Sequence, residues 1–405
     1  MSIKIVHTAD WHIGKQLLKV DFLEDMNLFF EWLINCIKVN EINVLLMSGD
    51  LFDQANPSQS ALTQYYSFLK QLIPLKCKVI ITGGNHDSPH VINAPKELLE
   101  FLDIKVVGGA PNNISELFGV IEIDNKKLVI AAVPFLRDKD IRIALPGESY
   151  SDKIEQIRSG IANYFQKVNQ HYLENHTGIP FIVMAHLYAQ GALKSESERE
   201  IQIGNQAGVE AVVFGSEPDY VALGHIHKPQ IVGEAHIRYS GSPIQLSFSE
   251  KEDKKEVVVL ELDGNTFKIS SIEIPLFRKL ITMRGTVAEI KERLATYSTV
   301  SQLTDLIELQ VVELNENIEY IRALEEFLTS EPVNGFQIVK GKIEFENKIA
   351  GTSSLLKGGE DIGDFQPVQL FEKRLDQDTS IENKEELINA FKEILESMGT
   401  TATSI

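Results

Sequence analysis

The chain has 405 residues, of which 43% are hydrophobic and 24% charged, and its formal net charge is −19. This length allows two or three domains with at least one large core, and no apolar run approaches the roughly 18 residues that span a bilayer. The charge excludes a protein that binds nucleic acid over its whole surface, because phosphate contacts need lysine and arginine. The negative net charge instead favours a protein that acts as part of an assembly, in which bound cations or a partner subunit supply positive charge.

The first part of the chain alternates strand and helix patterns. Strands are expected at 3–7, 44–47 and 79–82, and amphipathic helices at 22–39 and 60–72. Such alternation predicts an α/β fold with a largely parallel sheet covered by helices. Each strand runs into a polar cluster, and the carboxyl ends of parallel strands meet at one edge of a sheet. The polar clusters should therefore lie side by side.

The pattern then changes to shorter strands. Residues 117–133 alternate around an Asp124-Asn125 turn, and a long amphipathic helix is expected at 150–175. Further strands are predicted at 181–184, 220–223 and 237–240, and a hairpin at 257–262 and 267–272. The hairpin is indicated by Asp-Gly, a strong turn signal between two apolar runs. We assign 1–275 to one domain.

The organisation shifts at Pro275. Strand, helix, strand, helix and strand patterns over 279–345 predict a smaller α+β domain, for which we take residues 276–348. Residues 349–366, rich in glycine and serine, are predicted to be a linker. Residues 367–405 are predicted to be a helical tail that docks on a partner or back on this chain, because a short helical pair buries little apolar surface. Its candidate contacts are Leu387, Phe391 and Leu395.

The chemistry of the chain is concentrated in five short elements at predicted strand ends. They are Asp10-x-His12, Asp50-x-x-Asp53, Asn85-His86-Asp87, His186 and His225-x-His227. Any one of them is a weak signal, since a lone Asp-x-His is more often a surface turn. Together they combine carboxylate, imidazole and amide ligands, which suit manganese, iron or zinc rather than calcium or copper. Glycines before Asp50, Asn85 and His225 are expected to let the chain turn sharply.

These motifs resemble the calcineurin-like metallophosphoesterases, and within them the SbcD family of bacterial DNA-processing nuclease subunits. The segments that carry the resemblance are His7-Thr8-Ala9-Asp10-Trp11-His12-Ile13-Gly14, Gly49-Asp50-Leu51-Phe52-Asp53 and Met184-Ala185-His186. The resemblance covers about residues 1–275 by motif, and the rest by length and element order. It implies a four-layer α-β-β-α sandwich with a smaller α+β cap domain and a C-terminal helical tail.

The resemblance also implies a role for each site residue. Two divalent cations, for which we take Mn²⁺, would be bridged by Asp50. Asp10, His12 and His227 would hold the first cation, and Asn85, His186 and His225 the second. His86 would not be a ligand but would approach the scissile phosphate. Asp53 and Asp87 are expected behind the ligands, where they orient them.

The function implied by the resemblance is a two-metal DNA nuclease. It would act as an ATP-dependent double-strand exonuclease and as a single-strand and hairpin endonuclease with an SbcC-type, SMC-like ATPase, and as a homodimer within a heterotetramer. Another calcineurin-like phosphodiesterase or phosphatase, acting on nucleotides or small phosphoesters, would explain the metal site equally well. The second domain and the tail after Pro275 argue against this alternative, because a hydrolase of small molecules would not require them. A cytoplasmic location without membrane association is expected, because Cys36 and Cys77 form no Cys-x-x-Cys pair and fit free thiols in a reducing compartment.

Residues outside the motifs are given simpler roles. Trp11 is expected to pack under the site, and His7 to lie in the core or behind the ligands. Lys15 and Lys19 are expected to be solvated. The charged run 250–256 is expected to be a solvated loop.

Overall fold

The computed structural model describes residues 2–143, 147–195, 197–198, 208–330, 335–347, 367–377 and 383–401. The chain divides into two compact units. The first comprises Met1–Met283, Thr296–Leu309 and Ser330–Lys340, and the second Arg284–Ala295, Gln310–Thr329 and Gly341–Ile405. The predicted linker 349–366 lies outside the described residues, and the predicted domain limits at 275 and 348 stay predictions.

The first sheet of the first unit has the strand order β14-β13-β1-β4-β5-β6. Its four parallel strands are β1 (Ile3–Thr8), β4 (Val44–Ser48), β5 (Lys78–Thr82) and β6 (Ile104–Val107). The hairpin of β13 (Glu256–Asp263) and β14 (Thr266–Glu273) joins antiparallel to β1. Strand β1 near the start of the chain therefore lies beside β13, more than 200 residues later, in one sheet.

The second sheet has the order β11-β12-β10-β9-β8-β7. Strands β8 (Lys126–Ala132), β9 (Phe181–His186), β10 (Tyr220–Gly224) and β12 (Glu234–Tyr239) are parallel. Strands β7 (Phe118–Ile123) and β11 (Gln230–Val232) pair antiparallel at the two edges. Both sheets thus present the carboxyl ends of several parallel strands.

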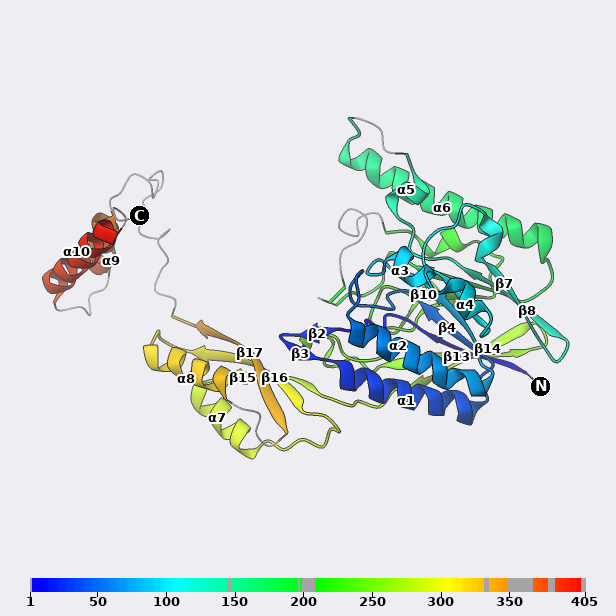
Figure 1. Ribbon diagram of the computed structural model, residues 1–405. Coiled ribbons are helices and arrows are strands. Elements are labelled where there is room, and N and C mark those ends of the chain that lie inside the picture. Colours follow the sequence, from blue (N-terminus) through cyan, green and yellow to red (C-terminus); the bar gives the residue numbers. More distant parts are fainter. Residues whose placement is uncertain are drawn as a thin grey trace. The chain divides into compact units, whose positions relative to one another are not determined.

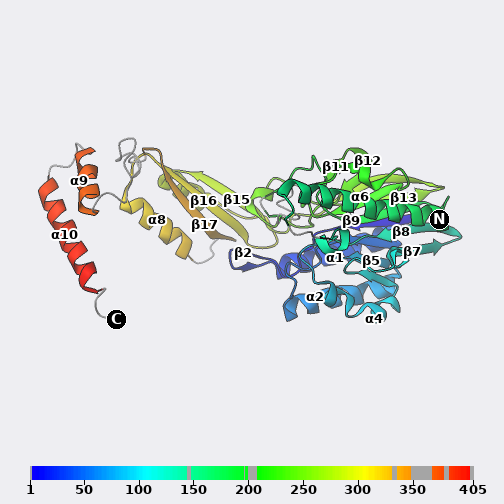
Figure 2. The same ribbon diagram turned by 90° about the horizontal axis from the view of Figure 1, so that it is seen from above.

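The alternation of side chains along β4 shows how the layers are held. Val44 and Leu46 join the apolar cluster shared with the second sheet, whereas Leu45 and Met47 join the cluster under helices α1 (Leu23–Asn40) and α2 (Gln59–Leu72). Successive side chains of a strand point to opposite faces, so a strand buried on both faces is apolar throughout. Helix α6 (Tyr150–Asn175) lies on the side opposite α1 and α2 (Figures 1 and 2). The predicted four-layer α-β-β-α sandwich is confirmed.

The remaining elements of this unit are short. They are β2 (Gln16–Leu17), β3 (Val20–Asp21), η1 (Ile73–Leu75), α3 (Pro89–Asn93), α4 (Lys96–Glu100), η2 (Ile114–Leu117), α5 (Asp138–Ile141), η3 (Ala211–Phe214) and η4 (Phe248–Glu250). The sequence predicted none of these elements, nor β6 and β11. Within the described ranges, no helix is long and apolar enough to cross a membrane.

The part of the chain after Pro275 contains the predicted α+β elements. A three-stranded sheet has the order β15-β16-β17, with β15 at Leu280–Gly285, β16 at Asp305–Glu313 and β17 at Phe336–Phe345. Helices α7 (Val287–Thr296) and α8 (Ile318–Thr329) follow the first two strands. The tail forms two helices, α9 (Pro367–Gln377) and α10 (Lys384–Thr401), in which Phe371 stacks on Phe391 with ring centroids 4.3 Å apart.

Candidate metal centre

The seven predicted ligands meet at the carboxyl ends of the central strands of both sheets. Asp10 and His12 follow β1, Asp50 follows β4, Asn85 follows β5, and His225 and His227 follow β10, whereas His186 is the last residue of β9. Six of them are at most 2% exposed, and Asn85 is half-buried. Residues from positions 10 to 227 thus form one buried cluster, as the sequence predicted.

Four of these residues adopt left-handed backbone conformations that side chains rarely take. Their φ angles are 53° at Asp10, 47° at His12, 52° at Asp50 and 104° at His225. Each such residue costs about 1–2 kcal/mol. Hydrogen bonds between neighbouring strand ends impose the conformation, for example Asp10 N to Gly49 O and His12 N to Asp50 O, both 3.0 Å. Strain of this kind at several neighbouring residues indicates a functional site.

The glycines before the ligands serve two different purposes. Gly49 has a φ of 80°, so it makes the sharp turn that the sequence predicted. Gly84 and Gly224 have no such φ; instead, a Cβ on Gly84 would collide with Asp50 and one on Gly224 with the carbonyl oxygen of Ser48. These two positions need glycine because other parts of the site approach the backbone closely.

The first group of candidate ligands consists of Asp10, His12 and His227. Their ligand atoms lie within 4.8 Å of one another, and the Nε2 atoms of His12 and His227 are 3.2 Å apart. Two neutral imidazoles cannot both turn a lone pair toward each other at this distance without a proton or a cation between them. The geometry therefore fits a cation bound by both rings.

The second group consists of Asp50, His186 and His225, again with ligand atoms within 4.8 Å of one another. Asn85 completes it, because its Oδ1 lies 2.9 Å from His186 Nε2 and 3.2 Å from His225 Nδ1. Asp50 Oδ2 is 3.4 Å from His186 Nε2 and 3.6 Å from His12 Nε2. Asp50 thus faces both groups, as a bridging carboxylate would.

The pKa values of the cluster reflect the burial of its carboxylates and imidazoles. Burial raises the pKa of Asp10 to about 7 and holds the pKa of His225 well below its usual value. Burial alone would also lower the pKa of His186, but Asp50 and Asp10 raise it to about 9. Carboxylates and imidazoles packed away from water in this way need a compensating cation. This donor set of carboxylate, imidazole and amide groups is suited to divalent metal ions.

His86 lies at the edge of the cluster and is 4% exposed. Its Nδ1 is 2.8 Å from the carbonyl oxygen of Asp53, so Nδ1–H donates and Nε2 is directed at the centre. Nε2 lies 4.0 Å from Asp50 Oδ2, and the ring packs edge-on to His12 at 4.6 Å. His86 also groups with His12 and Asp50 within 4.8 Å, so its role as a non-ligand stays a prediction.

Asp53 lies behind the first group of ligands. Its Oδ1 is 3.3 Å from His12 Nδ1 and 3.2 Å from Lys15 Nζ. Burial alone would raise the pKa of Asp53, but His12 and Lys15 lower it to about 2. The expectation that Lys15 is merely solvated is wrong, because the charge of Asp53 draws its ammonium to the edge of the site.

Asp87 connects the loops after β4 and β5. Its Oδ2 accepts from Leu51 N at 3.0 Å and Gly84 N at 2.8 Å, and its Oδ1 accepts from Phe52 N at 3.0 Å. Leu51 directly follows Asp50, and Gly84 precedes Asn85 by one position. Asp87 therefore supports the backbone that presents two of the predicted ligands, Asp50 and Asn85.

Two other predicted packing roles are confirmed. Trp11 is fully buried, donates from Nε1 to Thr8 Oγ1 at 3.0 Å and packs edge-on against Phe68. His7 is also buried, and its Nδ1 lies 3.0 Å from the hydroxyl of Tyr220. Both residues belong to the interior beneath the site.

The expectation of a solvated loop at 250–256 is wrong for two residues. Glu250 is 0% exposed and Lys255 is 4% exposed, and their side chains form an ion pair of 2.6 Å. Glu250 Oε1 lies 3.2 Å from His227 Nδ1. No sequence signal points to this contact, because a charged run does not reveal which of its members have buried partners.

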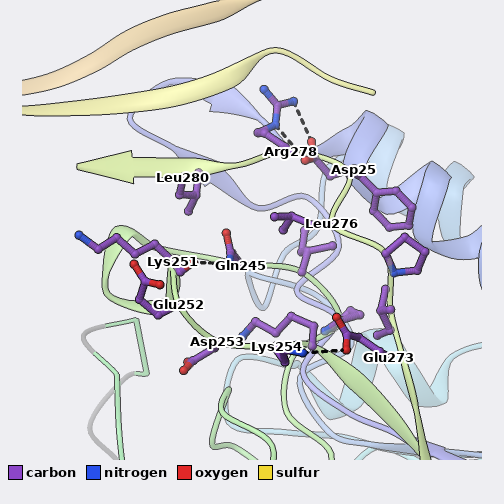
Figure 3. A pocket seen from close by; sticks show the side chains of 16 residues that line it. Asp25, Gln245, Lys251, Glu252, Asp253, Lys254, Glu273, Leu276, Arg278 and Leu280 are labelled. Carbon is purple, nitrogen blue, oxygen red and sulfur yellow. Dashed lines mark hydrogen bonds and ion pairs between the residues drawn. The ribbon is translucent and has the colours of Figure 1, made fainter. Parts of the chain in front are cut away.

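Lys255 also lines a pocket. Figure 3 shows this pocket. Its volume is about 190 Å³, and Lys255 is among the residues that line it, whereas none of the seven ligands does. Figure 3 shows the bidentate pair of Arg278 and Asp25 at one side, with Nε to Oδ1 at 2.9 Å and Nη2 to Oδ2 at 2.8 Å. The pocket is therefore separate from the metal centre.

Comparison with known proteins supports the interpretation of this cluster as a metal centre. A family model described as calcineurin-like phosphoesterase matches residues 3–229, more than half of the chain. A relative from Rhodobacter capsulatus, named as the SbcD component of the nuclease SbcCD, is 31% identical over 300 residues, with 70% of this chain and 71% of the relative covered. The chain belongs to the calcineurin-like phosphoesterases and, among them, to the SbcD family.

The similarity to the SbcD family is not restricted to the first domain. The SbcD protein of Escherichia coli K12 is 29% identical over 386 residues, with 92% of each chain covered. The SbcD protein of Staphylococcus epidermidis is 30% identical over 293 residues, with 71% of this chain and 74% of the relative covered. Family membership makes this chain a metal-dependent phosphoesterase.

Proposed function

We propose that this protein is a DNA nuclease that uses two divalent cations, with Mn²⁺ as the cation it prefers. The observation that carries the proposal is His86, fixed through Nδ1 at the edge of a buried cluster of seven ligands. The relatives are named as components of the nuclease SbcCD, which supports DNA as the substrate. Asp10, His12 and His227 would hold one cation, and Asn85, His186 and His225 the other, with Asp50 between them.

The chain's own residues then divide the chemistry. When bound, the cations would lower the pKa of a water molecule and neutralise charge that develops on the phosphate oxygens. The hydrogen bond from His86 Nδ1–H to Asp53 O turns Nε2 toward the centre. In the doubly protonated ring, a second N–H at Nε2 would donate to an oxygen of the scissile phosphate. The carbonyl oxygen of Ser48, 3.1 Å from His186 Nδ1, keeps the Nε2 of that ring directed at the centre.

We further propose that the nuclease works with an SbcC-type ATPase, as a homodimer within a heterotetramer in the cytoplasm. The complex would degrade double-stranded ends with ATP and cut single strands and hairpins, and residues 276–348 would shape the access of DNA. Leu387, Phe391 and Leu395 on α10 would contact the ATPase; Leu387 is 42% exposed, which leaves it accessible. The net charge of −19 supports a partner that contributes basic surface.

The test is cleavage of a hairpin-ended duplex with Mn²⁺, with and without the ATPase partner and ATP. The proposal expects cleavage that requires the cation and that the partner with ATP stimulates. Hydrolysis of a chromogenic phosphodiester without DNA cleavage under any condition would instead identify a phosphodiesterase for nucleotides or small phosphoesters.

The matched control is His86→Ala. It is expected to bind Mn²⁺ like the parent protein and to cleave about 10²–10⁴-fold more slowly, because it loses a positioned proton donor and no ligand. Loss of Mn²⁺ binding in this variant would mean that His86 is itself a ligand.

A further inference from the structure

The buried pair of Glu250 and Lys255 lies directly behind one metal ligand. Burying charges is costly unless they are paired and hydrogen-bonded, and replacing a buried ion pair by apolar residues is often neutral for stability. Such a pair beside His227 therefore suggests a task other than holding the fold together.

The carboxylate of Glu250 is bonded on both oxygens. Oε1 receives the His227 Nδ1 contact of 3.2 Å and a hydrogen bond from Ser197 Oγ. Oε2 accepts from Lys255 Nζ at 2.6 Å, from the amide of Leu246 at 3.2 Å and from Ser242 Oγ at 3.4 Å. These partners from three segments of the chain leave the carboxylate no freedom to turn away from His227.

His227 is held at its backbone as well as at its ring. Lys255 Nζ donates to the carbonyl oxygen of His227 at 3.0 Å and to Ser242 Oγ at 2.9 Å, so all three protons of the ammonium have acceptors. The amide of His227 donates to Glu198 Oε1 at 2.9 Å. The same ion pair thus fixes both the position of the residue and the orientation of its ring.

The orientation of the proton follows from these contacts. His227 Nδ1 faces Glu250 Oε1 and, at 2.8 Å, the oxygen of Ser197. The carboxylate only accepts hydrogen bonds, and Ser197 gives its one hydroxyl proton to Glu250 Oε1, so Nδ1 must carry the proton. The other nitrogen, Nε2, then presents its lone pair toward His12 Nε2, 3.2 Å away, where the first cation would lie. The opposite tautomer would place two lone pairs against each other at Nδ1 and a proton in the metal site.

The second group of ligands has no such contact with Glu250. His186 Nδ1 is directed by the carbonyl oxygen of Ser48, and His225 Nδ1 faces Asn85 Oδ1. Any effect of Glu250 on metal binding should therefore be confined to the cation flanked by His227.

We propose that Glu250, anchored by Lys255, is a positioning residue that fixes His227 as the Nδ1–H tautomer and thereby strengthens the binding of one of the two cations. This inference rests on the proposed two-metal function and goes beyond it, because it makes the two sites unequal in a defined way.

The test is the substitution Glu250→Gln. The amide keeps the size of the side chain, and its oxygen is expected to stay on the ammonium of Lys255, which turns the amide NH₂ toward His227 Nδ1. That contact favours the Nε2–H tautomer and blocks the first site. The control is Glu252→Gln. Glu252 lies two residues after Glu250 and its side chain is exposed, so this substitution removes the same charge from the surface (Figure 3).

Mn²⁺ titration calorimetry should resolve two sites in the parent protein and in Glu252→Gln. In Glu250→Gln one site should weaken by about 10- to 100-fold while the other is unchanged. Nitrogen-15 histidine spectra of the metal-free proteins, recorded at a pH high enough for a neutral His227 ring, should show the His227 tautomer reversed only in that variant. Glu250→Asp, which keeps the charge on a shorter side chain, should restore the Nδ1–H tautomer.

The double variant Glu250→Gln with Lys255→Met guards against misfolding, because it leaves no unpaired buried charge. It is expected to fold and to lose affinity at the same site, because the amide of Leu246, which donates to Oε2 in the parent protein, still holds the glutamine oxygen away from His227. Two sites of parental affinity and an unchanged tautomer in Glu250→Gln would overturn the inference alone. A parent protein that binds no divalent cation would overturn the proposed function together with it.

Discussion

The substitution Asp87→Ala tests how the loops that carry the ligands are held in place. Asp87 is 2% exposed, and its two oxygens accept the amides of Leu51, Phe52 and Gly84 at 2.8–3.0 Å. Removing the carboxylate leaves three buried N–H groups without these acceptors. Since the amides belong to the loops that present Asp50 and Asn85, the loss should affect stability and metal binding together.

The expected magnitude follows from those three amides. A buried donor without a partner costs about 1–3 kcal/mol. Burial, followed by the charge of Asp50, raises the pKa of Asp87 to about 6, so the substitution also relieves some repulsion. We therefore take the lower end of the sum and expect a loss of about 3 kcal/mol in the free energy of unfolding. Asp87→Asn should cost less, because an amide oxygen can still accept from two of the three donors.

The assay is urea denaturation of the metal-free protein, followed by Mn²⁺ titration. A loss of about 3 kcal/mol should lower the urea midpoint of the first unit by about 1 M. The control is Asp263→Ala at the exposed end of β13, which should stay within about 0.5 kcal/mol of the parent. Equal midpoints for Asp87→Ala and Asp263→Ala would refute the view that these hydrogen bonds hold the site together.

Three other predictions concern packing, protons and an ion pair. Gly224→Ala would place a Cβ against the Ser48 carbonyl and the His186 ring. We expect it to lower the free energy of unfolding by about 3 kcal/mol and to abolish metal binding. In the same denaturation assay, Gly119→Ala should unfold like the parent protein, which would exclude a general effect of alanine. The pKa of His186 is raised to about 9, so without metal its ring is protonated at neutral pH. Mn²⁺ must displace that proton, and the Mn²⁺ affinity should therefore rise about tenfold per pH unit up to about pH 9. Calorimetry that shows no proton release on Mn²⁺ binding would contradict this. Asp25→Ala leaves the Arg278 guanidinium buried without its carboxylate and should lower the free energy of unfolding by about 3–5 kcal/mol. Replacing both residues with apolar ones should cost much less. Equal losses of stability for the two variants in thermal unfolding would disprove that reasoning.

Local patterns along the chain were sufficient for most of the main elements. The apolar period of α6 predicted a helix at 150–175, and the structure has it at Tyr150–Asn175. The hairpin around Asp263 and Gly264 was predicted in the same way and is β13 with β14. Periodicity and turn residues are local properties, so they can be recognised before the position of any neighbour is known.

Local patterns failed where an element is short or depends on distant neighbours. Strand β6, Ile104–Val107, has four residues and is recognisable mainly by its pairing with β5. The need for glycine at Gly84 and Gly224 was foreseen for the wrong reason, because what excludes a side chain there is Asp50 in one case and the carbonyl of Ser48 in the other. Neither contact lies close in the sequence.

The amino-acid sequence by itself determined which side chains could bind metal, since Asp10, His12 and the later motifs each end a strand whose direction is set by the alternating fold. Only the tertiary structure decided that Glu250 and Lys255 belong to the same centre. In the sequence they are members of a charged run, and a charge is buried only where distant groups compensate it. Here those groups are the ring and carbonyl oxygen of His227, brought to them by the packing of two sheets.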